Sequence, residues 1–184
     1  MTFRKANNVT GWTVFLIALA TYVLTREARG SLWDTGEFIA SAKGLQLPHP
    51  PGAPLFVLLG RFFVILFGDG PLTAASAVNF LSALASAATI LFLFWSITHF
   101  GRKLYNTQED KLSIAQINII LGAGLVGSLA YTFSDSFWFS AVEGEVYALS
   151  SFFTALVFWA MLKWEQADER AGINSVDRLR ADRW

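Results

Sequence analysis

The sequence predicts an all-α, polytopic membrane protein, and two observations lead to that fold class. First, 54% of the 184 residues are hydrophobic and only 15% are charged, whereas about a quarter are charged in a typical soluble domain. Second, four long stretches contain no Asp, Glu, Lys or Arg and lack the polar face of a soluble helix. A spanning helix needs about 20 mostly apolar residues. Each charge-free stretch is therefore long enough to cross a bilayer; they are residues 6–25, 70–101, 112–134 and 146–162.

The chain, residues 1–184, is interpreted as a single membrane region whose elements follow in order. Four spanning helices are expected at about residues 9–25, 71–100, 114–133 and 146–162. An outer loop at 26–70 holds two short helices, at 36–47 and 55–67, and a polar and aromatic link covers 134–145. Residues 163–184 form a polar tail with helical propensity. Close helix contact is predicted at three glycines of the third span, Gly122, Gly124 and Gly127.

The apolar segment 55–67 does not meet the requirements of a spanning helix. At about 1.5 Å per residue it would be roughly 20 Å long, short of the ~30 Å hydrocarbon core. Arg61 lies in its middle, where a spanning position would cost about 2.5–3.5 kcal/mol. We therefore predict an interfacial or re-entrant helix with Arg61 facing polar surroundings.

Basic residues predict the orientation of the chain, because loops on the cytoplasmic side carry an excess of Lys and Arg. With the N-terminus cytoplasmic, the inner segments hold most of the basic side chains and the outer segments hold few. The inner set is Arg4, Lys5, Arg102, Lys103, Lys111, Lys163, Arg170, Arg178, Arg180 and Arg183, and the outer set is Arg26, Arg29, Lys43 and Arg61. Both ends of the chain are thus expected in the cytoplasm. The spanning helices are expected to contact membrane lipid.

Charge and cysteine content narrow the possible partners. The formal net charge is zero, and no basic patch with interleaved aromatic residues is present, so nucleic acid is not an expected partner. Cysteine is absent, which excludes disulfides and cysteine metal sites.

The first candidate site lies just after the first predicted span. Asp34 and Glu37 are three residues apart, so they would share one face of a helix. Spacing alone favours a capping box, in which Asp34 caps the helix and Glu37 reaches back. The alternative is functional, because a lipid-linked substrate could reach carboxylates at this position. His49 follows in a proline-rich loop, residues 48–54, where a lone histidine is weak evidence for a metal.

The second candidate site lies at the entrance to the fourth span. Ser140 and Glu143 have capping-box spacing, whereas Glu145 sits beside apolar residues at the membrane boundary, where acidic residues are functional candidates. On a helix, Glu143 and Glu145 would point to different sides, so at most one is expected to face a shared site. Tyr147 follows directly in the same segment.

Three motifs in this order resemble a known family. They are W-D-T-G-E-F at residues 33–38, P-H-P-P-G-A-P at 48–54, and F-W through E-V-Y at 137–147. Together they resemble the bacterial membrane family known as domain of unknown function 2723. That family is similar to the animal transmembrane protein O-mannosyltransferases and belongs to the GT-C glycosyltransferase superfamily. The resemblance covers nearly the whole chain.

The resemblance implies a GT-C-like fold and an enzyme that uses a lipid-linked sugar donor. Such an enzyme moves a sugar, mannose being the candidate, from a polyprenyl phosphate to an acceptor hydroxyl on the non-cytoplasmic face. The acceptor would be a protein Ser/Thr or a glycan. Asp34 occupies the place of the catalytic base, and Glu37 would orient the acceptor or Asp34. Glu145 matches a second acidic position, which binds a metal in some branches and not in others. The remaining substrate contacts are assigned to His49, Arg61, Glu143 and Tyr147, with Arg61 offsetting the phosphate charge.

Some features stay open at the level of sequence. The motif that contains Asp34 and Glu37 differs from the D-x-D pattern and from the adjacent Asp-Glu pair of classical O-mannosyltransferases. Metal dependence and sugar identity are therefore not fixed. No cofactor is assigned, and a divalent metal is left open. Family members are much longer, so the chain is expected to be the N-terminal part of a longer protein and to be inactive alone. The resemblance to a bacterial family implies a bacterial inner membrane. A non-catalytic assembly subunit or a transporter are the alternatives, although the charge-free spans argue against a transporter.

Overall fold

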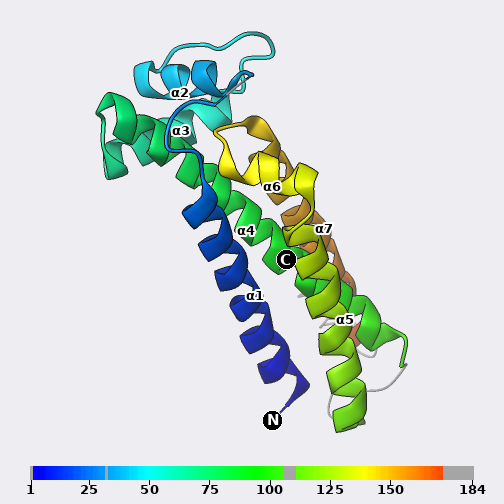
Figure 1. Ribbon diagram of the computed structural model, residues 1–184. Coiled ribbons are helices and arrows are strands. Elements are labelled where there is room, and N and C mark those ends of the chain that lie inside the picture. Colours follow the sequence, from blue (N-terminus) through cyan, green and yellow to red (C-terminus); the bar gives the residue numbers. More distant parts are fainter. Residues whose placement is uncertain (1, 32, 106–110, 172–184) are drawn as a thin grey trace.

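In the computed structural model, residues 2–31, 33–105 and 111–171 are described, and this part of the chain consists of helices joined by turns and loops, with no strand. Figure 1 shows the long helices running side by side, with the short helices gathered at the end of the bundle away from the N-terminus. The helices are α1 (Phe3–Thr25), α2 (Thr35–Gly44), α3 (Pro54–Phe67), α4 (Pro71–Lys103), α5 (Ile114–Thr132), α6 (Asp135–Val142) and α7 (Val146–Ala171).

Four helices, α1, α4, α5 and α7, are long and apolar enough to cross a membrane, which confirms the predicted polytopic fold. α4 is the central helix: it packs against α1, α5 and α7, and 61% of its apolar window is buried. The corresponding windows of the other three are only 17–22% buried. Their apolar outer faces suit lipid or further membrane helices.

Small residues let α5 approach α4 closely, as the glycine pattern predicts. A Cβ atom added to Gly124 would lie 2.7 Å from Thr98, and one added to Gly127 would lie 2.7 Å from Ile97. These contacts leave no room for a larger side chain. Gly122 differs, since a Cβ there would meet nothing within 4 Å. The prediction of close contact is therefore confirmed for two glycines and wrong for Gly122, which faces away from α4.

The short helices form one end of the bundle (Figure 1). α3 is 14 residues long, or roughly 21 Å at about 1.5 Å per residue, which matches the predicted short helix. Arg61 on α3 donates to the Lys43 carbonyl at 2.7 Å and pairs with Asp69 at 3.2 Å, so it does face polar groups. That α3 does not cross the membrane stays a prediction, and the short length of the helix supports it.

Several elements differ from the sequence prediction. α1 begins at Phe3 rather than near residue 9, and α2 ends at Gly44 rather than at residue 47. The link at 134–145 contains a helix, α6, because Phe137, Ala141 and Val142 recur at helical spacing and are buried against the core. α7 runs past residue 162 to Ala171, so the polar tail is helical up to that point. Residues 172–184 lie outside the described part of the chain.

Candidate active site

A pocket of about 220 Å³ opens at the end of the bundle that carries α2 and α6. It joins the two candidate sites, although more than a hundred residues separate them in the sequence. Asp34 comes from the start of α2, whereas Glu143, Glu145 and Tyr147 come from the α6–α7 connection. The full lining is Trp33, Asp34, Phe139, Ser140, Glu143, Glu145 and Tyr147.

Backbone and side-chain hydrogen bonds hold the loop between α1 and α2 in place beside this pocket. The Glu27 amide donates to the Val142 carbonyl at 3.1 Å, which ties the loop to the end of α6. Asn79, fully buried on α4, donates its side-chain amide to the Glu27 carbonyl at 2.8 Å and the Arg29 carbonyl at 3.2 Å. Trp33 then adopts φ 62°, a left-handed conformation that costs a non-glycine residue about 1–2 kcal/mol. Strain of this kind often marks a functional segment.

The carboxylates of the first site do not cap α2, so the capping-box interpretation is wrong. Asp34 is the N-cap residue, yet its side chain makes no capping hydrogen bond; only its backbone carbonyl accepts from Phe38, at 3.0 Å. Glu37 does not reach back to the Asp34 amide but bonds to His49. The Asp34 carboxylate is 56% exposed and is directed to the pocket.

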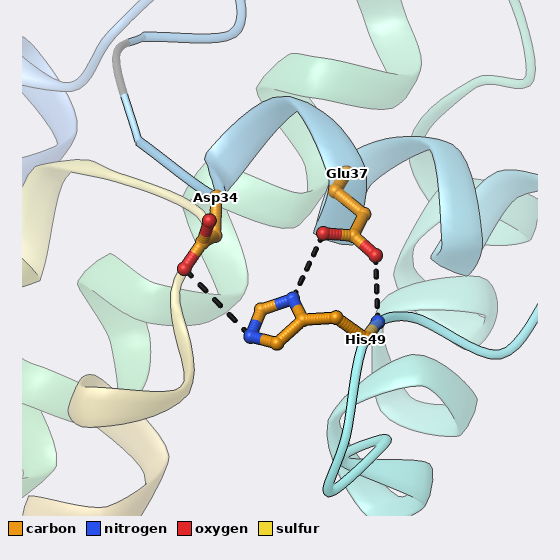
Figure 2. A network of polar contacts seen from close by, with 3 residues as sticks. All are labelled: Asp34, Glu37 and His49. Carbon is orange, nitrogen blue, oxygen red and sulfur yellow. Dashed lines mark hydrogen bonds and ion pairs between the residues drawn. The ribbon is translucent and has the colours of Figure 1, made fainter.

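Glu37 and His49 form a two-point contact (Figure 2). The His49 backbone amide donates to Glu37 Oε1 at 2.6 Å, and His49 Nδ1 lies 2.9 Å from Glu37 Oε2. His49 Nε2 lies 3.9 Å from Asp34 Oδ2. The hydrogen bond from His49 lowers the pKa of Glu37, and the same bond, with the charges of Glu37, Asp34 and Glu145, raises the pKa of His49.

The turn after His49 explains how this side chain reaches α2. The Gly52 amide donates to the His49 carbonyl at 2.9 Å, and Gly52 has φ 88°, a conformation that L side chains rarely adopt. Prolines on both sides of His49 restrict the backbone further. Phe38, buried on α2, lies beside the imidazole with ring centroids 6.0 Å apart. The loop therefore presents His49 in one defined place.

The second site contributes two buried carboxylates, which corrects the expectation that at most one would face a shared site. Glu143 is 3% exposed and Glu145 is 8% exposed, and both line the pocket. Glu143 is the C-cap of α6 with an extended backbone, so the helical geometry behind that expectation does not apply. For the same reason, Ser140 and Glu143 form no capping box, and the Ser140 hydroxyl donates to the Ser136 carbonyl at 3.3 Å.

The surroundings of these two carboxylates differ. Ser31 and Thr35 donate their hydroxyls to Glu143 Oε2, the latter at 3.0 Å. Burial raises the pKa of Glu145, and the negative charges of Asp34 and Glu143 raise it further. The connection between the two acids, Gly144, packs so closely on α4 that an added Cβ would lie 2.9 Å from Asn79 Oδ1.

Comparison with known proteins assigns the family. The family model described as the N-terminal domain of protein O-mannosyl-transferase TMEM260 matches residues 34–184, which is most of the chain and includes every predicted site residue. The chain belongs to this family.

The curated relatives bear the same name. The mouse protein O-mannosyl-transferase TMEM260 is 30% identical over 166 residues, which cover 89% of this chain and 21% of the mouse protein. The protein O-mannosyl-transferase tmem260 of Dictyostelium discoideum is 24% identical over 146 residues, covering 79% of this chain and 16% of the relative. The chain thus spans about a sixth to a fifth of the length of these relatives. No solved structure matches it.

Within this TMEM260-type domain, the structure brings most of the predicted site residues together. Asp34, Glu143, Glu145 and Tyr147 line the pocket. His49 lies beside it, 3.9 Å from Asp34, and Glu37 contacts His49. Arg61 is not among the lining residues and is held by Asp69 and the Lys43 carbonyl. Its role in offsetting phosphate charge stays a prediction.

Sequence reasoning did not assign a site role to the hydroxyl donors or to the aromatic residues Trp33 and Phe139. Ser31 and Thr35 matter because they satisfy the buried Glu143, and two aromatic side chains, Trp33 and Phe139, border the pocket. Thr35 belongs to the W-D-T-G-E-F motif, and Ser31 lies two residues before that motif. Their partner is more than a hundred residues away, so no local pattern indicates the contact.

Three groups of this domain are close enough to be considered for a cation. Ligand atoms of Asp34, Glu37 and His49 lie within 4.8 Å of one another. Both Glu37 oxygens, however, already accept hydrogen bonds from His49, and a shared cation would have to displace the one from the ring. The arrangement is therefore described as a hydrogen-bonded network, and participation of a divalent metal stays a prediction.

The pocket chemistry suits a neutral ligand rich in hydroxyl groups. Three of its seven lining residues carry carboxylates, and none of these seven is basic. Carboxylates accept hydrogen bonds from hydroxyls and repel phosphate, while aromatic faces pack against apolar C–H surfaces. Asp34 adds a group that can accept a proton from a bound hydroxyl.

Proposed function

We propose that this domain forms the acceptor side of a membrane O-mannosyltransferase. Mannose would be transferred from a polyprenyl-phosphate donor to the hydroxyl of a protein Ser or Thr, and the enzyme would be of the GT-C type. The observation that carries the proposal is the position of Asp34, which lines a carboxylate-rich pocket while its side chain makes no capping hydrogen bond to α2. The names of the relatives in the same family support mannose and protein as the sugar and the acceptor.

In this proposal Asp34 is the general base. The acceptor hydroxyl gives its proton to the Asp34 carboxylate, and its oxygen attacks the anomeric carbon of the donor sugar. The bond from that carbon to the phosphate oxygen breaks, the phosphate keeps the electron pair, and the configuration is inverted. Because the lining residues include no basic group, the phosphate would lie outside this pocket. Glu143, Glu145 and Tyr147 would contact hydroxyls of the sugar or acceptor.

We also propose that the pocket faces the non-cytoplasmic side, with the N-terminus cytoplasmic, in a bacterial inner membrane. The unequal distribution of Lys and Arg supports this orientation. Single cysteines at Ser136, beside the pocket, and at Lys111, at the other end of the bundle, would test it, since both positions are exposed and the chain has no cysteine. An impermeant thiol reagent added outside should label position 136 only, and labelling of position 111 instead would reverse the orientation.

The decisive experiment on function is Asp34→Asn in the full-length protein. Asparagine keeps the size of the side chain but does not accept a proton at neutral pH. Loss of the base should lower transfer about 10²- to 10⁴-fold, while the helix start is unaffected because Asp34 makes no capping bond. Transfer is measured with a polyprenyl-phosphate mannose donor and a Ser/Thr peptide at equal membrane levels of each variant.

A matched control is Asp135→Asn, which removes an exposed carboxylate on α6 at the same end of the bundle. It should transfer at the parental rate. If Asp34→Asn also stayed within a few-fold of the parent, the base role would be refuted, and a non-catalytic assembly subunit would become the better description of this domain.

A further inference from the structure

The contact between Glu37 and His49 fixes both the place and the protonation pattern of the imidazole. Glu37 uses one oxygen for the His49 backbone amide and the other for Nδ1. An ionised carboxylate only accepts hydrogen bonds, so Nδ1 must carry a proton. The lowered pKa of Glu37 keeps this carboxylate ionised. The remaining ring nitrogen, Nε2, is thereby directed toward Asp34 (Figure 2).

The distance from His49 Nε2 to Asp34 Oδ2 is 3.9 Å, which is too long for a direct hydrogen bond. One oxygen atom can nevertheless lie about 2.8 Å from both atoms at once, which is an ordinary hydrogen-bond distance. The two side chains are 48% and 56% exposed, so a ligand can reach this space from outside. The distance between the two atoms therefore allows one hydroxyl oxygen to bridge them.

We propose that this gap holds the acceptor hydroxyl, with His49 Nε2–H donating to its oxygen and Asp34 accepting its proton. Glu37 is then a positioning residue that acts only through His49. This inference rests on the proposed transferase function and deepens it, because it assigns the acceptor subsite and gives the histidine of the proline loop a role.

The charges around His49 favour the protonated imidazole that this arrangement needs. Three carboxylates face it: Glu37 and Asp34 from α2 and its N-cap, and Glu145 from the α6–α7 connection. All three raise its pKa, and the largest cause is the hydrogen bond that His49 Nδ1–H donates to Glu37. During transfer the proton of the acceptor goes to Asp34, the acceptor oxygen bonds to the anomeric carbon, and the phosphate leaves with its electron pair. His49 keeps its own proton throughout.

Substitutions at His49 separate hydrogen bonding from proton transfer. His49→Ala should lower kcat/KM for the acceptor about 10- to 100-fold, as expected for loss of a charge-assisted hydrogen bond, while KM for the lipid donor is unchanged. His49→Gln places an N–H near the former Nε2 and should restore most of the rate. The parental rate should fall as pH rises through the raised pKa of His49, because the imidazole then loses its Nε2 proton. His49→Gln should remove this fall, because the amide does not titrate. His49→Asn ends near the former Nδ1 and should not restore the rate.

Coupling between the two residues tests the role of Glu37. Glu37→Gln alone should lower transfer, but in the His49→Ala background it should cost nothing further, since its effect passes through the imidazole. The inference is overturned if His49→Ala stays within about twofold of the parent, if His49→Gln is as inactive as His49→Ala, or if the two changes are additive. The melting temperature of each variant is measured by tryptophan fluorescence, and a value equal to that of the parent establishes that the variant is folded.

The two proposals can fail separately. If Asp34→Asn is inactive but the His49 variants are not impaired, the transferase function stands and the acceptor subsite is wrong. If Asp34→Asn remains active, the base role is wrong whatever the His49 variants do.

Discussion

Each end of the helix bundle has a histidine in contact with a glutamate, and the two contacts differ in their charge balance. One joins Glu37 of α2 to His49 in the loop before α3, and the other joins His99 of α4 to Glu165 of α7. At the pocket end, Glu37 holds His49, and the carboxylates of Asp34, Glu143 and Glu145 lie nearby. At the other end, His99 lies 3.5 Å from Glu165, and Lys103 reaches the same carboxylate at 2.6 Å. The rise of α4 between Asn79 and His99 is roughly 30 Å, about the thickness of the hydrocarbon core.

The difference indicates which end is built for a ligand. At the far end, Lys103 balances the charge of Glu165, and the contact joins α4 to α7, as expected for structural packing. At the pocket end, four carboxylates lie close together, and among the described residues the ion pairs that they make involve His49. Negative charge is therefore left facing the pocket. Uncompensated charge lowers stability and is typical of functional sites.

Among changes that test this difference between the two ends, Glu145→Gln should have the largest effect, because it removes one of the neighbouring carboxylates of the pocket. Transfer should fall about tenfold through loss of a hydrogen-bond acceptor for the substrate. Stability should change in the opposite direction. Because the folded pKa of Glu145 is raised, the folded state retains the proton longer than the unfolded chain does. Stability from this group is complete below the ordinary pKa of 4.5 and is lost as pH rises through the raised folded pKa.

The corresponding measurement is the melting temperature of parent and Glu145→Gln as a function of pH. The variant should melt at a higher temperature near neutral pH, and the difference should disappear below pH 4.5. A variant that is less stable than the parent at neutral pH would show that Glu145 is a stabilising group. Its carboxylate could then not be counted as uncompensated charge at the pocket end.

A smaller effect is expected from Gly52→Ala in the loop that carries His49. Alanine at φ 88° costs about 1–2 kcal/mol, and its Cβ would lie 2.9 Å from Leu47. The turn should shift and move His49 from Asp34, which lowers transfer several-fold. Gly122→Ala is the matched control, because it lies within α5 and a Cβ there meets nothing within 4 Å. Equal activity of the two variants would mean that the loop conformation does not matter to the site.

Sequence alone predicted the parts of this fold that depend on local composition. Each of the four long helices is marked by its own charge-free window, so no knowledge of neighbours is needed. α6 was missed because its buried face matters only once Phe137 meets Tyr22 and Tyr131 from other helices.

The site shows the same limit more sharply. The two acidic clusters were found from the sequence, but the spacing of Asp34 and Glu37 could not reveal that Glu37 prefers His49 to the helix amide. The pairing of Glu143 with Thr35 and Ser31 is likewise a contact between distant segments. Local patterns give candidate groups, and the competition among partners is decided by the tertiary fold.

The smallest effect is expected from Glu165→Gln, at the far end of the bundle. This change is chemically identical to Glu37→Gln, since both remove the charge of a glutamate that contacts a histidine. Glu165 is 44% exposed, and ion pairs in contact with solvent contribute little to stability. The glutamine side chain can still accept a hydrogen bond from Lys103. Transfer and melting temperature should therefore match the parent, whereas Glu37→Gln lowers transfer. If Glu165→Gln impaired transfer as much as Glu37→Gln, both contacts would act by holding the helices together. The charge difference between the two ends of the bundle would then say nothing about where the substrate binds.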